Sequence, residues 1–160
     1  MGKQSSGIDT VEFRNTLGKF ATGICVVTTD TADGPIGMTI NSFSSVSLEP
    51  ALILWNIQKS SECFQAFDTA NGYAISILSD QQMDISNQFA QRGSHLLNKD
   101  QYILGESGQA ILKDALATME CSIWAKYEGG DHIILVGEVE KFSAAESGEP
   151  LIFFSGAYRF

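Results

Sequence analysis

A long hairpin pattern near the C-terminal end constrains the fold more than any other feature of the sequence. Apolar residues alternate with mostly polar neighbours from Met119 to Tyr127, which is the period-two pattern of a half-buried antiparallel strand. Gly129-Gly130-Asp131 predicts a turn, and residues 132–142 return as the partner strand. The chain is therefore expected to pair strands antiparallel through hairpins.

Shorter elements fill the rest of the chain. Strands are predicted at residues 24–29, 36–41, 51–56, 73–78 and 151–154. Helices are predicted at residues 8–19, 61–70 and 79–91, and residues 92–114 read as a loop. Strands joined by hairpins with few intervening helices favour a mainly β, antiparallel barrel with a few flanking helices over a doubly wound sheet.

Aromatic residues at helix or strand spacing are expected to lie in the core rather than at a cofactor. They are Phe13, Phe20, Phe64, Phe67, Phe153 and Phe154. Cys25, Cys63 and Cys121 are widely spaced within apolar stretches, so they indicate buried thiols rather than metal ligands. No metal site is therefore predicted.

Size and composition predict one globular domain over residues 1–160. Hydrophobic residues make up 44% of the chain and charged residues 18%, which argues against disorder. Residues 1–7 are expected to form a flexible tail, and they lack the apolar centre of a secretory signal, which favours the cytoplasm. No membrane span is expected, because no run of apolar residues is long enough. The net charge of −9 and the lack of a Lys/Arg cluster argue against a nucleic-acid partner.

Small hydrogen-bonding side chains crowd the stretch that follows the strand at residues 36–41. Six of them occupy nine positions: Thr39, Asn41, Ser42, Ser44, Ser45 and Ser47. Such side chains can donate and accept while a planar ligand lies close to the backbone. The pattern suits a ring with carbonyls and ring nitrogens along its edge, but an ordinary Ser-rich edge strand or turn is equally compatible with it.

Two further candidates lie downstream. Lys59-Ser60-Ser61 precedes a predicted helix, where free N–H groups, hydroxyls and one lysine can bind a phosphate; serine is also a favoured N-cap. His132 follows the Gly-Gly-Asp turn and could hydrogen-bond an amide or a phosphate, or be an ordinary surface histidine. His95, in the predicted loop, is expected to face solvent. No Rossmann glycine motif or phosphate-binding loop is present.

Four motifs in order give the chain a family resemblance. They are Phe13-Arg-x-x-Leu-Gly-x-Phe-Ala-Thr-Gly-Ile-Cys-Val-Val-Thr-Thr29, Gly37-Met-Thr-x-Asn-Ser-Phe-Ser-Ser-Val-Ser-Leu-x-Pro50, Gly130-Asp-His132 and Gly156-Ala-Tyr158. Over about residues 12–159 the chain resembles the flavin reductase-like family, short-chain reductases of two-component monooxygenases with an FMN-binding split-barrel fold. It departs from that family at Ala51, where a second proline is frequent, and at Ala157, where glycine is usual.

The resemblance implies a role for each matching residue. Contacts to the flavin ring and ribityl chain are implied for Thr39, Asn41, Ser42 and Ser45. The phosphate would be held by Lys59, Ser60 and Ser61, with Ser86 and Phe89 closing over it. His132 would meet the nicotinamide nucleotide, with Tyr158 nearby.

The expected activity is therefore reduction of FMN, or of FAD, by NADH or NADPH. The two cofactors carry the hydride transfer while the protein aligns their rings. The resemblance also implies a homodimer that passes reduced flavin to a separate oxygenase. Two alternatives remain open on the same barrel: a non-enzymatic flavin-binding or electron-carrier protein, and an oxidase of a pyridoxine-type phosphate. The last would want more basic residues than the 10 Lys and Arg present.

Overall fold

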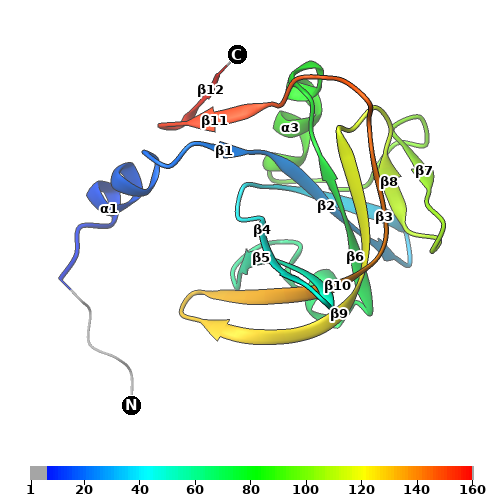
Figure 1. The fold of residues 1–160 in the computed structure, drawn as a ribbon. Helices are drawn as coiled ribbons and strands as arrows, with labels where there is room; N and C mark the ends of the chain where they lie inside the picture. Colours follow the sequence, from blue (N-terminus) through cyan, green and yellow to red (C-terminus); the bar gives the residue numbers. More distant parts are fainter. Residues whose placement is uncertain (1–6, 160) are drawn as a thin grey trace.

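A seven-stranded antiparallel sheet forms the body of the protein in the computed structural model, which describes residues 7–159 (Figure 1). The tail expected at residues 1–7 lies, apart from Gly7, outside the described residues. The strands of this sheet are β2 (Cys25–Thr31), β3 (Gly34–Ile40), β4 (Ser44–Leu48), β5 (Ala51–Gln58), β6 (Gly72–Ile77), β9 (Ala117–Gly129) and β10 (His132–Ala144). Their order is β3-β2-β6-β9-β10-β5-β4, and no pairing within residues 7–159 joins the two edges β3 and β4. The sheet therefore curls without closing, and the prediction of a mainly β, antiparallel architecture is confirmed.

The long hairpin is the centre of the sheet. β9 pairs with β10 from Gly129 opposite His132 to Ala117 opposite Ala144, with two register shifts that bend the pair. One shift adjoins Gly137, where an added Cβ would lie 2.4 Å from the Tyr73 hydroxyl. That hydroxyl donates to the carbonyl of Leu135 at 3.2 Å. Position 137 therefore requires a glycine, because the Tyr73 ring lies against the hairpin there.

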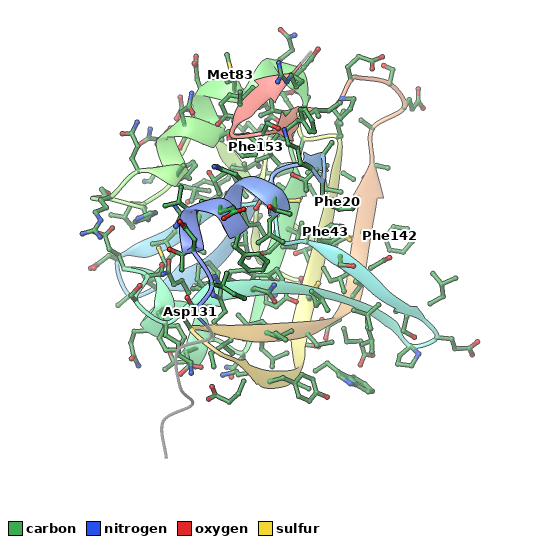
Figure 2. The ribbon with its side chains drawn as sticks, turned by 90° about the vertical axis from the view of Figure 1, so that its left-hand side faces the viewer. Phe20, Phe43, Met83, Asp131, Phe142 and Phe153 are labelled. Atoms are coloured by element: carbon green, nitrogen blue, oxygen red, sulfur yellow. The ribbon has the colours of Figure 1, made fainter. Side chains whose placement is uncertain are left out.

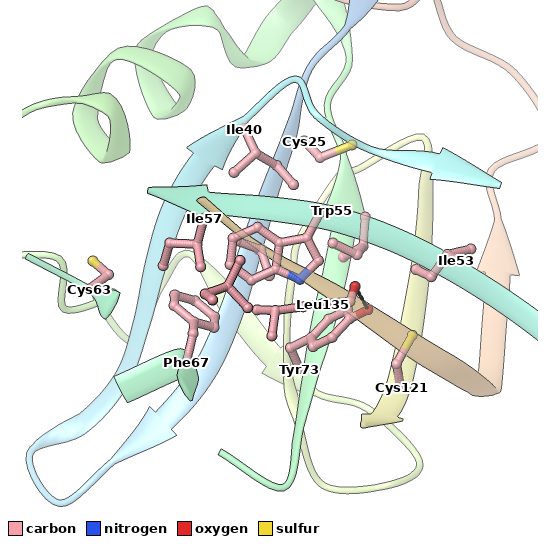
Figure 3. Packing of buried hydrophobic residues seen from close by; sticks show 13 residues of the cluster. Cys25, Ile40, Ile53, Trp55, Ile57, Cys63, Phe67, Tyr73, Cys121 and Leu135 are labelled. Atoms are coloured by element: carbon pink, nitrogen blue, oxygen red, sulfur yellow. Dashed lines mark hydrogen bonds between the residues drawn. The ribbon is translucent and has the colours of Figure 1, made fainter. Parts of the chain in front are cut away.

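The concave side of the sheet encloses the larger core cluster (Figure 3). Trp55 is fully buried and makes edge-to-face contacts with Phe67 and Tyr73, at ring-centroid distances of 4.9 and 5.8 Å. All three cysteines are free and buried, as predicted. Burial raises the pKa of Cys25 to about 12, so that thiol stays protonated.

A second core cluster lies under the helix that covers one end of the sheet. The 3₁₀ turn η1 (Asp80–Gln82) leads into α3 (Met83–Ala90), and a capping box forms between Ser79 and Gln82. Phe89 of α3 is fully buried in this cluster, alongside Val26 and Leu78. α2 (Phe64–Thr69) covers the other cluster with Phe67.

Four short strands were not predicted. β7 (Tyr102–Leu104) and β8 (Ala110–Leu112) form a hairpin inside the stretch expected to be a loop, so that prediction is wrong there. The turn between them is held by the buried Glu120 carboxylate, which accepts from the N–H and hydroxyl of Ser107. β1 (Thr22–Gly23), β11 (Ile152–Phe154) and β12 (Ala157–Arg159) form a separate three-stranded sheet. Of these strands only β11 was expected.

The first helix, α1 (Thr10–Leu17), begins after an N-cap at Asp9, whose carboxylate accepts from the N–H groups of Val11 and Glu12. It buries none of its residues and stands away from the sheet (Figure 1). The prediction that Phe13 and Phe20 lie in the core is therefore wrong, since their side chains are 50% and 81% exposed. Of the other aromatics, Phe67 is buried, and the rest are half-buried: Phe64, Phe153 and Phe154. Within the described part of the chain, no helix is both long and apolar enough to cross a membrane.

Candidate functional site

Three hollows follow β3 and its exit loop, and Thr39 lines all of them. We call them together the β3 groove. Their volumes are about 190, 330 and 250 Å³. The groove begins between β3 and α3, runs over the loop that follows β5, and ends at the tip of the β9–β10 hairpin.

The first hollow, the buried end of the groove, is built on a chain of hydrogen bonds. The Thr39 hydroxyl donates to the carbonyl of Ser86 at 2.6 Å. The Ser86 hydroxyl lies 2.8 Å from the Tyr158 hydroxyl, which donates to the Asn87 carboxamide at 2.8 Å. Ser86 is fully buried. These bonds tie β12, α3 and β3 together, so the wall of this hollow is preorganised.

The middle hollow is lined by Ser60 and Ser61, two of the residues expected to bind a phosphate, together with Arg92. The Ser61 hydroxyl accepts from the N–H of Cys63 at 3.2 Å, so it also serves the turn before α2. Phe89 borders the same hollow but is fully buried, and it supports the wall from beneath. The hollow thus presents two hydroxyls and one guanidinium, which can bind an anion, beside the carboxylate of Glu62, which already accepts hydrogen bonds from Gly93 and His95.

His95 joins the two sides of the middle hollow. Its Nδ1 lies 3.0 Å from the Gly37 carbonyl and its Nε2 lies 3.1 Å from the Glu62 carboxylate. The side chain is only 11% exposed, so the prediction that His95 faces solvent is wrong. The N–H of Gly93 and the ring of His95 both donate to Glu62 and hold its pKa below the ordinary value. This contact fastens the loop that carries Arg92 to the start of α2.

The third hollow, the hairpin end of the groove, lies between the exit of β3, β5 and the start of β10. Ser42, Asn56 and His132 line it. The Ser42 hydroxyl accepts from the Asn56 N–H at 3.0 Å, whereas the Asn56 side-chain oxygen is buried without a partner among the described residues. A ligand N–H bound in this hollow is a suitable partner for that oxygen.

His132 is more exposed than the groups at the buried end. Its side chain is 40% exposed and its Nδ1 lies 2.7 Å from the Asp131 carboxylate. The hydrogen bond and the charge of His132 lower the pKa of Asp131. With Nδ1 bonded to Asp131, Nε2 is the ring nitrogen left for a ligand.

Two predicted site residues are not brought to the groove. Ser45 is exposed on the edge strand β4 and lines none of the three hollows. The Lys59 ammonium lies 2.6 Å from the Glu128 carboxylate of the hairpin, and Lys59 also lines none of them. His132 and Tyr158 line different hollows, at the two ends of the groove.

Sequence reasoning missed several polar residues that line the groove, among them Asn56, Gln58 and Arg92. Asn56 and Gln58 lie at the end of β5, a strand that was predicted from its apolar residues alone. Arg92 opens a stretch read as a featureless loop. A signal was available for it, because Arg92 follows directly on the helix that carries Ser86.

A hollow of about 770 Å³, larger than any part of the groove, lies elsewhere, near the end of β2 and α2. Thr29, Asp30 and Gln65 are among its lining residues, and none of the predicted site residues reaches it. Within residues 7–159 no group of three or more His, Cys, Asp or Glu side chains is placed to hold a metal ion.

Several known proteins are similar to this chain over most of their own length. An NADH-dependent FMN reductase of Agrobacterium fabrum is 43% identical over 152 residues, which cover 95% of this chain and 86% of the relative. The reductase subunit of a flavin-dependent monooxygenase of Mycobacterium tuberculosis is 35% identical over 156 residues, covering 96% and 83%. The solved structure of an NADH:FAD oxidoreductase of Streptomyces globisporus matches with a TM-score of 0.91 at 34% identity, covering 100% and 97%.

The same oxidoreductase has been solved in complex with NAD and FAD fragments, and that structure also matches with a TM-score of 0.91 at 34% identity, covering 99% of this chain and 96% of that one. A family model described as a flavin reductase-like domain matches residues 17–160. The match includes β3, the loop after β5, α3 and the hairpin, and therefore every element that lines the β3 groove. The chain belongs to the flavin reductase-like family.

Proposed function

We propose that this protein is an NADH-dependent flavin reductase that binds FMN in the β3 groove. One observation carries the proposal: nine of the eleven residues predicted for flavin and nicotinamide line adjoining hollows around Thr39. The names of the relatives support the reaction, because they are NADH-dependent FMN or FAD reductases.

We assign the contacts to the flavin ring and its ribityl chain to the end of β3 and the residues that follow it, Thr39 to Ser42. The Thr39 hydroxyl donates its hydrogen to Ser86, so it meets a ligand as an acceptor. Asn41 is exposed in the groove, and its carboxamide can both donate and accept. Ser42 already exchanges bonds with the backbone of Asn56, so it contributes shape more than a free donor.

The phosphate belongs in the middle hollow, on Ser60 and Ser61. We assign Arg92 as its cation, because the Lys59 ammonium is held by Glu128 outside this hollow. A planar guanidinium also suits a phosphate better than an ammonium does, since it can form two parallel hydrogen bonds. Ser86, Phe89 and Tyr158 form the wall beside it and stay in place through the bonds described above.

The nicotinamide approaches from the hairpin end. Flavin and nicotinamide supply the redox chemistry: a hydride passes from the reduced nicotinamide to the oxidised flavin, together with one proton from water. His132 contributes orientation, because the free Nε2 can bond to the carboxamide or phosphate of the nucleotide while Asp131 holds the ring. No nucleophile or acid–base pair is needed for this transfer.

The product, reduced flavin, goes to a separate oxygenase. Relatives that are reductase components of flavin-dependent monooxygenases support this step. The competing hypothesis of a non-enzymatic flavin carrier is less favoured, because the relatives are reductases over nearly the whole chain.

The protein acts as a homodimer in this proposal. α1 presents exposed apolar side chains, among them Val11, Phe13 and Leu17, and buries none of its residues within the described part of the chain. A second copy is a suitable cover, since a helix needs to bury an apolar face against another element. Free thiols at all three cysteines fit the reducing cytoplasm.

A cuvette assay tests the activity. Purified protein is mixed with NADH or NADPH and with FMN, FAD or no flavin, and nicotinamide oxidation is followed by absorbance. The proposal predicts oxidation of NADH that requires added flavin and is faster with FMN. Background rates with every combination would contradict the reductase and leave the carrier hypothesis, which predicts flavin binding without turnover.

A further inference from the structure

The middle hollow of the β3 groove contains a carboxylate that a phosphate site has to accommodate. Among the described residues that line this hollow, Glu62 is the one acid, and it directly follows Ser60 and Ser61. A phosphate monoester such as that of FMN carries about 1.5 to 2 negative charges at pH 7, so an ionised carboxylate beside it is repulsive. Arg92 offsets only the charge of Glu62. The hollow therefore needs a second cation before it attracts a phosphate.

The ring of His95 faces two hydrogen-bond acceptors in this hollow. Its Nδ1 lies 3.0 Å from the Gly37 carbonyl oxygen, and its Nε2 lies 3.1 Å from the Glu62 carboxylate. Glu62 is ionised, since hydrogen bonds from the N–H of Gly93 and from His95 lower its pKa. A carbonyl and an ionised carboxylate only accept, and a neutral imidazole carries a hydrogen on one nitrogen alone. Both contacts are therefore hydrogen bonds only when the ring is an imidazolium.

The backbone holds His95 in place without help from the ion pair. The N–H of Gly37 donates to the His95 carbonyl at 2.9 Å, and the N–H of Leu97 donates to the Pro35 carbonyl at 2.9 Å. The His95 side chain is 11% exposed, so it is shielded from the water that weakens ion pairs at the surface. A change of side chain at Glu62 or His95 therefore alters the charge of the hollow while these backbone bonds still attach the loop to β3.

We propose that the Glu62–His95 pair makes the middle hollow selective for a flavin that carries a phosphate. With His95 as an imidazolium, the hollow carries two positive charges and one negative charge, so it attracts a phosphate. Neither side chain of the pair has to touch the flavin, because Ser60, Ser61 and Arg92 bind the phosphate. FMN is thus bound in preference to riboflavin, which lacks the phosphate. The inference rests on the proposed function, which places FMN in the β3 groove.

The test compares FMN with riboflavin, which differ only in the phosphate. Dissociation constants are measured by quenching of flavin fluorescence in the wild type, in His95→Gln and in Glu62→Gln/His95→Gln. We expect His95→Gln to raise the constant for FMN about tenfold, because the carboxylate is no longer compensated, and that for riboflavin to stay within about twofold. The double variant restores the net charge of the hollow, so its constant for FMN should return to within about threefold of the wild type.

A purely structural role for the pair predicts a different pattern. Loss of a structural contact would weaken FMN and riboflavin alike, and removing both partners would restore neither. The matched control Glu106→Gln/Lys141→Gln removes another ion pair, at 3.4 Å between exposed side chains, and should change neither constant. This pair is remote from the groove, since Phe142, next to Lys141, lies on the opposite side of the molecule from Asp131 at the hairpin end (Figure 2).

The charge of His95 can be measured directly in the ligand-free protein. The chain has two histidines, so the ¹⁵N NMR signals of the ring nitrogens are assigned by comparing the wild type with His132→Gln. At pH 7 the His95 ring should show two protonated nitrogens, and a neutral ring would overturn the inference. This measurement decides the question even if thermal melting shows that His95→Gln does not fold.

The binding data can overturn the inference in two further ways. One is an unchanged FMN-to-riboflavin ratio in folded His95→Gln, and the other is a double variant that binds FMN no better than His95→Gln. Both results leave the reductase activity untouched. A wild type that binds FMN but oxidises no nicotinamide overturns the proposed function, and the ratio still decides the role of the Glu62–His95 pair. A wild type without affinity for FMN overturns both.

Discussion

The two ends of the β3 groove differ in the kind of polar side chain that they carry and in how those side chains are held. At the buried end, Thr39, Ser86 and Tyr158 are linked by short hydrogen bonds around a fully buried serine. At the hairpin end, Asp131, His132 and the Lys59–Glu128 pair interact at the surface, with side chains 40–81% exposed. Buried hydrogen bonds are costly to break, whereas exposed ion pairs contribute little. The difference suits a fixed wall for the flavin and an adaptable entrance for a nucleotide that must come and go.

The largest effect is expected at the buried end. Tyr158→Phe keeps the ring, which packs edge-to-face on Phe153, but removes the hydroxyl between Ser86 and Asn87. Because the buried Ser86 hydroxyl then lacks its partner, the free energy of unfolding should fall by about 1–3 kcal/mol. Urea denaturation measures it. Tyr127→Phe, at an exposed tyrosine on β9, is the matched control and should have almost no effect. Equal losses of stability in the two variants would contradict the claim that the hydrogen bonds at the buried end stabilise the fold.

The next largest effect is expected for FMN binding, on which Arg92 and Lys59 should differ. Arg92→Gln is expected to raise the dissociation constant for FMN about tenfold, since a charge-assisted bond to the phosphate is lost. Lys59→Gln should leave it within about twofold, because that ammonium is bound to Glu128. Fluorescence titration with FMN measures both. A larger loss of FMN affinity in Lys59→Gln than in Arg92→Gln would assign the phosphate to Lys59, as the family resemblance implied.

A smaller and more selective effect is expected at the hairpin end. His132→Ala should raise KM for NADH about fivefold, the cost of roughly one hydrogen bond, with the FMN dissociation constant unchanged. Steady-state kinetics at saturating FMN and a parallel FMN titration measure the two quantities. Equal weakening of both ligands would show that His132 does not separate nicotinamide from flavin.

The smallest effect concerns pH. The pKa of Asp131 is lowered by its hydrogen bond to His132 and by the charge of His132. A depressed carboxyl pKa contributes stability that is present above the ordinary value of 3.8 and is lost as pH falls through the lower folded value. Urea midpoints of the wild type should therefore drop slightly more than those of Asp131→Asn across this acidic range. Parallel profiles would indicate that the Asp131–His132 pair does not form in solution.

Much of the fold follows from local patterns in the sequence. The alternation from Met119 to Tyr127 and the Gly-Gly-Asp turn predicted β9, β10 and their pairing, because side-chain period and turn chemistry act within a few residues. The three-residue strands β7 and β8 were missed, because segments so short carry no periodic signal. α1 shows a different error: its spacing predicted a helix correctly, but none of the residues of that helix is buried within the described part of the chain.

The grouping of the candidate residues could be predicted where they are neighbours in the sequence, and less so where the fold assembles them. The stretch from Thr39 to Ser42 follows one strand, so its members reached one groove together. Ser45 lies beyond the turn into β4 and points elsewhere, although the alternative of a Ser-rich edge strand describes that segment. His95 reaches the groove only through the path of the loop after α3, which no local pattern specifies, whereas Arg92 follows closely on the helix that carries Ser86.

Blocking the residue common to all three hollows is the most direct test of the central claim that the β3 groove is the flavin site. Thr39→Phe places a ring where the hollows meet, and Ser143→Phe places the same ring on an exposed position of β10. FMN-dependent oxidation of NADH is measured for both variants and the wild type, with thermal melting to confirm folding. The account predicts that the folded Thr39→Phe variant loses nearly all flavin-dependent activity while Ser143→Phe keeps the wild-type rate. Wild-type turnover in a folded Thr39→Phe variant would contradict it.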